Sequence, residues 1–193
     1  MKKDIILAGV GGQGILTIAT IIGDAAANAG VNLKQAEVHG MSQRGGDVQS
    51  NLRLSNDEIY SDLIACGSAD LIISMEPMEA LRYLPYLAAD GRIITSSHKY
   101  ENIPNYPRYE DLMKEIGSLP SAIALPIEDL AKASSLPKSA NVLLLGMAAK
   151  YIEILTPEQL RESIARVFAS KGEGVVAMNQ QAFDIGLNAV KDK

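Results

Sequence analysis

Three glycines at a fixed spacing constrain the fold of this chain more than any other feature. Gly9, Gly11 and Gly14 follow an apolar run over residues 5–8 and precede a second apolar run over residues 15–22. This order predicts a strand, a tight glycine turn and a helix, which together open a Rossmann-like α/β unit. In such a unit the first glycine permits the turn, the second lets a ligand approach the backbone, and the third lets helix and strand pack closely.

The glycine turn is also the predicted ligand-binding segment. The free N–H groups at the start of a helix favour an anion. A contact with an anionic ligand or coenzyme is therefore expected at Gly9, Gly11, Gly12, Gln13 and Gly14. The same residues allow another interpretation, in which the turn serves only backbone packing or the docking of another chain.

The rest of the chain alternates apolar runs with turn signals. This pattern predicts an α/β fold: a Rossmann-like three-layer α/β/α sandwich with a mostly parallel sheet and C-terminal helices. The alternation over 48–54 is typical of an edge or antiparallel strand, and residues 97–109 are expected to form a long surface loop. Strands are predicted at 4–8, 31–38, 48–54, 69–75, 92–96 and 121–125, with a short element at 59–60. Helices are predicted at 13–29, 76–87, 109–116, 141–155 and 175–190, with two more beginning at 126 and 156.

Length and composition exclude several classes of protein. The 193 residues suit one α/β domain over 1–193, and the net charge of −5 argues against non-specific nucleic-acid binding. The one cysteine, Cys66, allows no internal disulfide and no iron–sulfur cluster held by this chain, and we expect it to be a small core residue. Two histidines make a zinc site in this chain improbable.

The distribution of apolar residues bears on where the protein works. The N-terminal apolar run is too short for a signal peptide. Elsewhere the apolar runs fall short of the roughly 18 residues that a membrane span requires. We therefore expect a soluble, cytoplasmic protein.

A second polar segment follows the second predicted strand. It is rich in glycine and carries a histidine and an arginine, which is typical of functional loops. Arg44 could form a bidentate pair with a carboxylate or phosphate, and His39 could exchange protons near neutral pH, so these two are the candidate catalytic residues. Alternatively, the polar groups of the loop serve its own backbone. The loop consists of His39, Gly40, Met41, Ser42, Gln43, Arg44, Gly45 and Gly46.

Glu37 is compatible with a different class of protein. In a dinucleotide-binding domain, an acidic residue near the end of the second strand holds the ribose hydroxyls. The chain could thus be a stand-alone dinucleotide-binding dehydrogenase or a nucleotide-sensing module. Against this, Gln13 and the pair His39–Gly40 depart from the usual dehydrogenase context, and no Lys, Tyr or His cluster has a dehydrogenase-like spacing.

Taken together, the segments over residues 9–14 and 37–46 resemble one family, the gamma-type subunit or domain of 2-oxoacid:ferredoxin oxidoreductases. The nearest pattern is that of the small (beta) subunit of the indolepyruvate form. The helix from Asn141 and the tail over 179–186 are similar to the same family. The resemblance thus covers the whole chain.

The resemblance implies an accessory role in a larger enzyme. Such enzymes decarboxylate a 2-oxoacid, here indolepyruvate or another arylpyruvate, to an acyl-coenzyme A and pass electrons to ferredoxin. Thiamine diphosphate, Mg²⁺ and the [4Fe–4S] clusters are expected in a large partner subunit and none of them in this chain, with coenzyme A as co-substrate. The isolated chain would be inactive, and its loop over 39–46 would face the partner.

Overall fold

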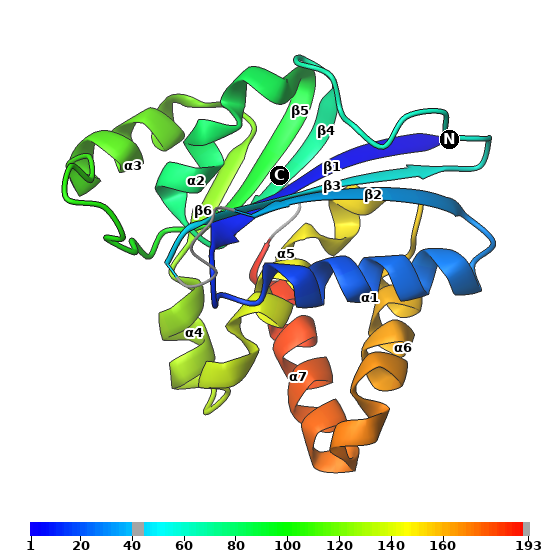
Figure 1. Cartoon of the computed structure of the whole chain (residues 1–193). Coiled ribbons are helices and arrows are strands. Elements are labelled where there is room, and N and C mark those ends of the chain that lie inside the picture. The colour runs from blue at the N-terminus through cyan, green and yellow to red at the C-terminus, as the bar shows by residue number, and fades with distance from the viewer. Residues whose placement is uncertain (40–44, 191–193) are drawn as a thin grey trace.

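The computed structural model of the chain describes residues 1–39 and 45–190. The predictions made for Gly40, Met41, Ser42, Gln43 and Arg44 lie outside the described residues, as does the side chain of His39. The described residues form one sheet between two layers of helices (Figure 1). The predicted three-layer α/β/α arrangement is therefore confirmed.

The sheet is mixed, with one reversed strand. Its strand order is β2-β3-β1-β4-β5-β6. β3 runs antiparallel to both of its neighbours, β2 and β1, whereas β1, β4, β5 and β6 are mutually parallel. The antiparallel prediction for 48–54 is thus correct, although this strand is internal and β2 lies at the edge. The strands are β1 (Lys2–Val10), β2 (Asn32–His39), β3 (Asp47–Ser55), β4 (Ala69–Ser74), β5 (Leu87–Ser96) and β6 (Ala122–Leu125).

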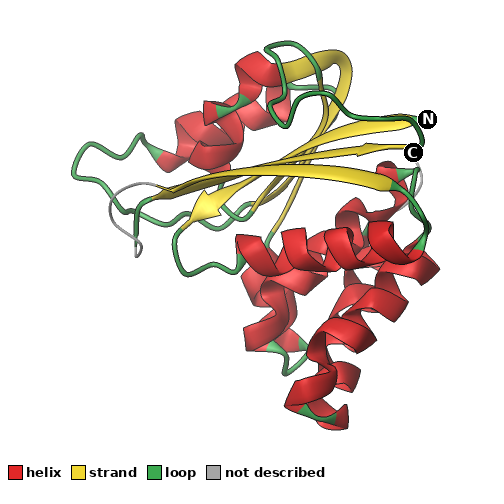
Figure 2. Ribbon diagram, turned by 45° about the vertical axis from the view of Figure 1, so that its right-hand side comes forward, coloured by secondary structure: helices red, strands yellow, loops and turns green. Residues whose placement is uncertain are grey.

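Helices cover the two faces of the sheet unequally. Two helices, α2 (Pro77–Arg82) and α3 (Tyr109–Ser118), lie on the upper face in Figure 1. Figure 2 shows the other five helices gathered on the opposite face. These are α1 (Ile15–Asn28), α4 (Ile127–Ala133), α5 (Ala140–Ile152), α6 (Pro157–Phe168) and α7 (Glu173–Ala189), with short 3-10 turns at Leu84–Tyr86, Pro137–Ser139 and Ala169–Lys171.

Side chains along β1 alternate between two hydrophobic cores, one on each face of the sheet. Ile5 and Leu7 pack into the large cluster with α1 and α5, and Ile6 and Ala8 pack into the smaller cluster on the α2 side. All four are fully buried, as expected for a central strand covered on both sides. In the part of the chain that the structure describes, helices long and apolar enough to cross a bilayer are absent.

The helix predicted from residue 76 is shorter than expected. It ends at Arg82, because Pro85 has no N–H to continue the helical ladder and its ring would clash with the preceding turn. Strand β5 then begins at Leu87 rather than at residue 92. The pair Asp90–Gly91 lies inside β5, at a shift of register against β4.

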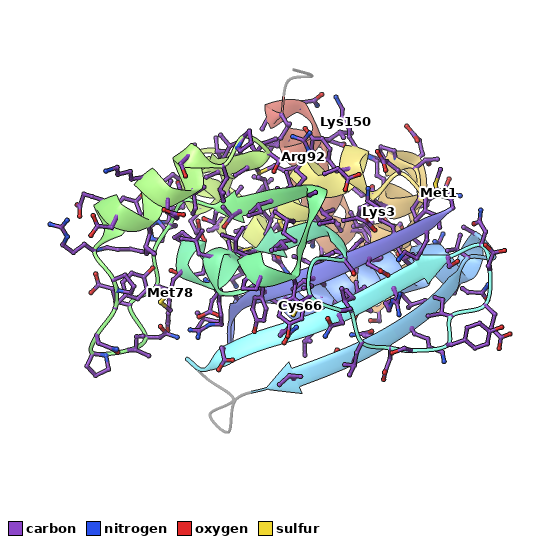
Figure 3. The ribbon with its side chains drawn as sticks, turned by 90° about the horizontal axis from the view of Figure 1, so that it is seen from above. Met1, Lys3, Cys66, Met78, Arg92 and Lys150 are labelled. Carbon is purple, nitrogen blue, oxygen red and sulfur yellow. The ribbon has the colours of Figure 1, made fainter. Side chains whose placement is uncertain are left out.

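The connection from β3 to β4 also differs from expectation. No helix or strand forms at Ile59–Tyr60, and Cys66, predicted to lie in the core, is exposed on this connection. Figure 3 shows Cys66 on the face that carries α2. The irregular connection carries the chain from one side of β1 to the other, so its residues follow neither a helical nor a strand pattern.

Helices α5 and α7 pack closely against each other. A Cβ atom added at Gly146 would collide with the Phe183 carbonyl oxygen, and one at Gly186 would collide with the Leu143 carbonyl oxygen. Two helix backbones therefore meet directly, and α5, which is apolar on most sides, is buried within its own fold.

We predict that Gly186→Ala lowers the free energy of unfolding by about 2 kcal/mol, because overpacking a tight contact costs about 1–3 kcal/mol. The matched control is Gly174→Ala in the same helix, where the added Cβ would have no neighbour within 4 Å. Alanine is favoured over glycine in helices by about 0.5–1 kcal/mol, so this variant should be as stable as the parent or slightly more so. Urea unfolding of both variants measures the difference, and equal stabilities would contradict the packing argument.

Candidate functional site

The glycine turn lies where the chain changes direction around the sheet. After β1 the chain enters α1 on the lower face, and after the adjacent parallel strand β4 it enters α2 on the upper face. In open α/β sheets, ligands bind outside the carboxyl ends of strands at such a switch point. The turn over residues 11–14 is therefore at the expected location for a binding site.

The glycines of the turn have distinct roles. Gly12 and Gly14 adopt positive φ angles of 103° and 81°, a region that side chains with a Cβ rarely enter. Gly9 lies within β1, and a Cβ there would come within 2.9 Å of the side chains of Gln13 and Ile15. Gly9 thus allows the close packing of strand and helix, and Gly14 allows the turn. The spacing predicts the opposite roles, with Gly9 at the turn and Gly14 at the packing contact.

Gln13 joins two parallel strands. Its Oε1 accepts a hydrogen bond from the Val10 amide at 2.7 Å, and its Nε2 lies 3.4 Å from the Met75 carbonyl oxygen. The side-chain amide therefore connects the end of β1 to the end of β4. Both polar atoms of the Gln13 side chain therefore bond to backbone groups.

Asn141, at the start of α5, supports the turn from the opposite side. Its Nδ2 donates to the Gly14 carbonyl oxygen at 3.1 Å. A Cβ on Gly14 would lie 2.5 Å from the same nitrogen. Gly14 is thus required twice, for its φ angle and for the space that Asn141 occupies.

The far end of the predicted polar loop meets the same turn. The Gly11 amide donates to the Gly46 carbonyl oxygen at 2.8 Å, and the Gly45 amide donates to the Gly11 carbonyl oxygen at 3.3 Å. The two glycine-rich segments singled out in the sequence are therefore hydrogen-bonded neighbours in the fold.

A groove of about 690 Å³ opens beside the turn. A smaller hollow of about 400 Å³ adjoins it, and both include Gly12, Gln13, Lys138 and Asn141 in their linings. The large groove continues between apolar side chains that belong to the helical layer, namely Leu136, Phe168, Val175 and Met178.

The charges of the groove favour an anionic ligand. Lys138 and Lys171 both line it, and at Gly12 a Cβ would meet open space, so the backbone there is accessible. Ser135, at the end of α4, holds a left-handed φ of 61° where the chain turns into the lining segment. The groove thus combines cationic groups, open backbone at a helix start and an apolar wall, which suits a molecule with both anionic and apolar parts.

Sequence reasoning missed several of these residues. Lys138, Asn141, His98 and Glu128 all line the smaller hollow, although His98 lies 30 residues before Glu128 in the chain. His98 lies in the segment expected to be a surface loop; its side chain is exposed, and it also lines this hollow. Only the order of the strands shows that these segments meet.

A buried carboxyl group stands at the end of β4. Glu76 is fully buried, and burial raises its pKa, opposed by hydrogen bonds from Tyr106 and from the backbone of Glu79 and Tyr100. Burial and the bond to Glu76 also raise the pKa of the Tyr106 hydroxyl. Among the residues that the structure describes, no group of three or more His, Cys, Asp or Glu side chains could hold a metal ion.

The position of Glu37 disfavours a dinucleotide-binding role. Glu37 lies on β2, and β3 separates β2 from β1. Strands in a sheet are about 4.8 Å apart, so Glu37 is displaced by one strand from the position next to β1 that holds the ribose in dinucleotide-binding domains. The Gln35 side chain donates to its carboxylate.

The fold and site define an α/β chain with a groove beside the carboxyl ends of its central strands, and comparison with known proteins identifies its family. The sequence matches the pyruvate ferredoxin/flavodoxin oxidoreductase family over residues 4–189, and the chain belongs to that family. It is 35% identical to the indolepyruvate oxidoreductase subunit IorB of Thermococcus kodakarensis, over 100% of this chain and 98% of that protein.

Solved structures show the same fold. The 2-oxoglutarate:ferredoxin oxidoreductase from Magnetococcus marinus, with 2-oxoglutarate, coenzyme A and succinyl-CoA bound, aligns with a TM-score of 0.76 and 21% identity. That alignment covers 100% of this chain but 32% of the other, so this chain spans about a third of that protein chain. The gamma subunit of the keto/oxoacid ferredoxin oxidoreductase from Geobacter sulfurreducens aligns with a TM-score of 0.70 and 22% identity over 96% of both chains.

We predict that Gly14→Ala lowers the free energy of unfolding more than Gly12→Ala does. Both substitutions place a side chain at a positive φ, which costs about 1–2 kcal/mol, but only Gly14 also faces Asn141. In an Asn141→Ala background the excess cost of Gly14→Ala should shrink by about 1 kcal/mol, because interacting positions show coupling of about 0.5–3 kcal/mol. Strict additivity of the two changes in urea unfolding would refute the contact.

Proposed function

We propose that this chain is the accessory subunit of a 2-oxoacid:ferredoxin oxidoreductase that acts on indolepyruvate or a similar arylpyruvate. The observation that carries the proposal is the 35% identity, over nearly the full length of both chains, to a protein named as an indolepyruvate oxidoreductase subunit. In this proposal the enzyme decarboxylates its substrate oxidatively to an acyl-coenzyme A and reduces ferredoxin.

Thiamine diphosphate, Mg²⁺ and the iron–sulfur clusters belong to the partner subunit in this proposal. One cysteine in the whole chain does not suit a cluster that takes four thiolates. The described residues likewise offer no cluster of acidic or imidazole ligands for a metal ion. When bound in the partner, the thiamine supplies the carbanion chemistry and the clusters carry the electrons; this chain's residues would shape access to that centre.

Coenzyme A is the ligand that we propose for the groove. Its phosphates would meet the open backbone at Gly12 and the ammonium groups of Lys138 and Lys171, and its apolar parts would lie along Leu136 and Phe168. The mixed character of the groove supports this assignment. The remaining turn residues, Gly9, Gly11, Gln13 and Gly14, would hold the backbone of the site in place.

The polar loop over 39–46 is proposed to face the partner. Gly45 and Gly46 are hydrogen-bonded to Gly11, so a partner that contacts the loop would lie next to the groove. Within the loop, His39 and Arg44 remain the proposed residues for proton exchange and for pairing with a carboxylate or phosphate.

Affinity purification of the tagged chain under anaerobic conditions tests the proposed function. We expect a large partner to be retained, with iron and thiamine in the eluate and indolepyruvate-dependent ferredoxin reduction that requires coenzyme A. A chain recovered alone that binds NADH saturably at micromolar concentration would instead support the dinucleotide-binding alternative.

We predict that Lys138→Ala raises the KM for coenzyme A of the assembled enzyme by about ten-fold and changes kcat by less than about two-fold, because a hydrogen bond to a charged group contributes about 1.5–3 kcal/mol. Steady-state assays across coenzyme A concentrations measure this. The control is Lys132→Ala on α4, whose ammonium group lies 3.9 Å from Asp129 and outside the groove. An unchanged KM in Lys138→Ala would argue against coenzyme A at this position.

A further inference from the structure

The loop over residues 97–108 is attached to the rest of the fold along its length. At its start, the His98 amide donates to Ser96 Oγ at 3.0 Å, and the Tyr109 hydroxyl donates to the Ser97 carbonyl oxygen at 2.9 Å. In its middle, Asn102 Nδ2 donates to the Gly45 carbonyl oxygen at 2.9 Å. A segment without helix or strand is thus held by specific side-chain contacts.

The central attachment of this loop is Glu76. Its Oε1 accepts a hydrogen bond from the Tyr106 hydroxyl. The same oxygen accepts the Tyr100 amide at 3.3 Å. Its Oε2 accepts the Glu79 amide at 2.9 Å and so caps α2. A fully buried carboxyl group therefore joins the end of β4, the start of α2 and two points of the loop.

A buried carboxyl group is costly unless its surroundings satisfy it. Glu76 lies beside a second fully buried acid, Glu79, which is paired with Arg82 at 2.8 Å. An apolar residue would fill the space beneath α2 without that cost. Two of the three donors around Glu76 come from the loop, which indicates that the carboxyl group holds the loop as well as capping α2.

The loop in turn forms part of the site. His98 and Tyr100 line the smaller hollow beside the glycine turn, together with Gln13 and Lys138. Through Asn102 the loop is bonded to Gly45, which is bonded to Gly11. The Gln13 side chain also lies 3.4 Å from the carbonyl oxygen of Met75. Because Met75 directly precedes Glu76, the glycine turn is connected to the attachment point of the loop.

We propose that Glu76 is a positioning residue, which with Tyr106 holds the loop over residues 97–108 as a wall of the hollow beside the glycine turn. The consequence for ligand binding rests on the function proposed above, whereas the attachment itself does not. Neither Glu76 nor Tyr106 lines the groove or the hollow, so their influence on a ligand acts through His98 and Tyr100.

The test is hydrogen exchange, measured by mass spectrometry, on the full chain in the complex in which it is purified. Tyr106→Phe removes one hydroxyl and keeps the ring. Backbone amides over 97–106 should exchange about ten-fold faster, because the loop loses one of its two hydrogen bonds to the buried carboxyl group. The matched control is Tyr109→Phe, which removes a hydroxyl bonded to the Ser97 carbonyl oxygen instead. It should leave exchange at Tyr100 unchanged.

A second measurement separates positioning from general stability. In Tyr106→Phe the KM for coenzyme A should rise by about three- to ten-fold, with kcat and the melting temperature close to those of the parent. Glu76→Gln should increase exchange in the same segment and also loosen the first turn of α2.

Unchanged exchange over 97–106 in both Tyr106→Phe and Glu76→Gln would overturn the attachment, whatever the ligand of the groove is. Faster exchange with an unchanged KM would overturn the role as a wall of the site. Neither result would bear on whether the chain assembles with a thiamine-bearing partner, which the affinity purification decides.

Discussion

The fold depends on how closely β1 and α1 approach each other. Gly9 has no side chain, so Ile15 and Gln13 occupy the space that a Cβ would take. This contact brings the start of α1 onto the end of β1, and the Gln13 amide then connects β1 to β4. The close approach thus places the glycine turn beside the groove and within reach of the Asn141 side chain.

The reversed strand β3 determines which ligands the turn can accept. In a dinucleotide-binding fold, the strand next to β1 carries the acidic residue that holds the ribose. Here β3 takes that place and arrives from the opposite direction, so the adjacent backbone at this edge is Gly45 and Gly46. A glycine spacing that is shared with nucleotide-binding proteins therefore serves a site with different neighbours.

Local sequence patterns were sufficient for the elements and for part of the site. The strand–turn–helix opening, the antiparallel nature of β3 and the C-terminal helices were predicted from glycine spacing and apolar periodicity. The length of α2 and the start of β5 were missed although Pro85 is a local signal that ends a helix. The exposure of Cys66 was missed because the β3–β4 connection has neither a helical nor a strand pattern.

The parts of the site that sequence reasoning missed are those that tertiary structure assembles. Lys138 and His98 belong to segments about 40 residues apart in the chain, and they share a hollow because β5 and β6 are adjacent. From the sequence, Glu76 is only the first residue of a predicted helix, since its contacts with Tyr100 and Tyr106 come from a loop without periodicity. Long-range contacts of this kind leave no local signal.

The strand order also has a consequence for how the chain folds. Both neighbours of β1 in the sheet, β3 and β4, are made after it and lie far along the sequence. Strand β1 therefore has no sheet partner during synthesis until β3 is made, whereas β2 and β3 pair from residues that are close in sequence. Such non-local pairing slows folding and prolongs the exposure of apolar surface. The apolar segment Lys2–Val10 therefore stays without its sheet partners until β3 and β4 have been made.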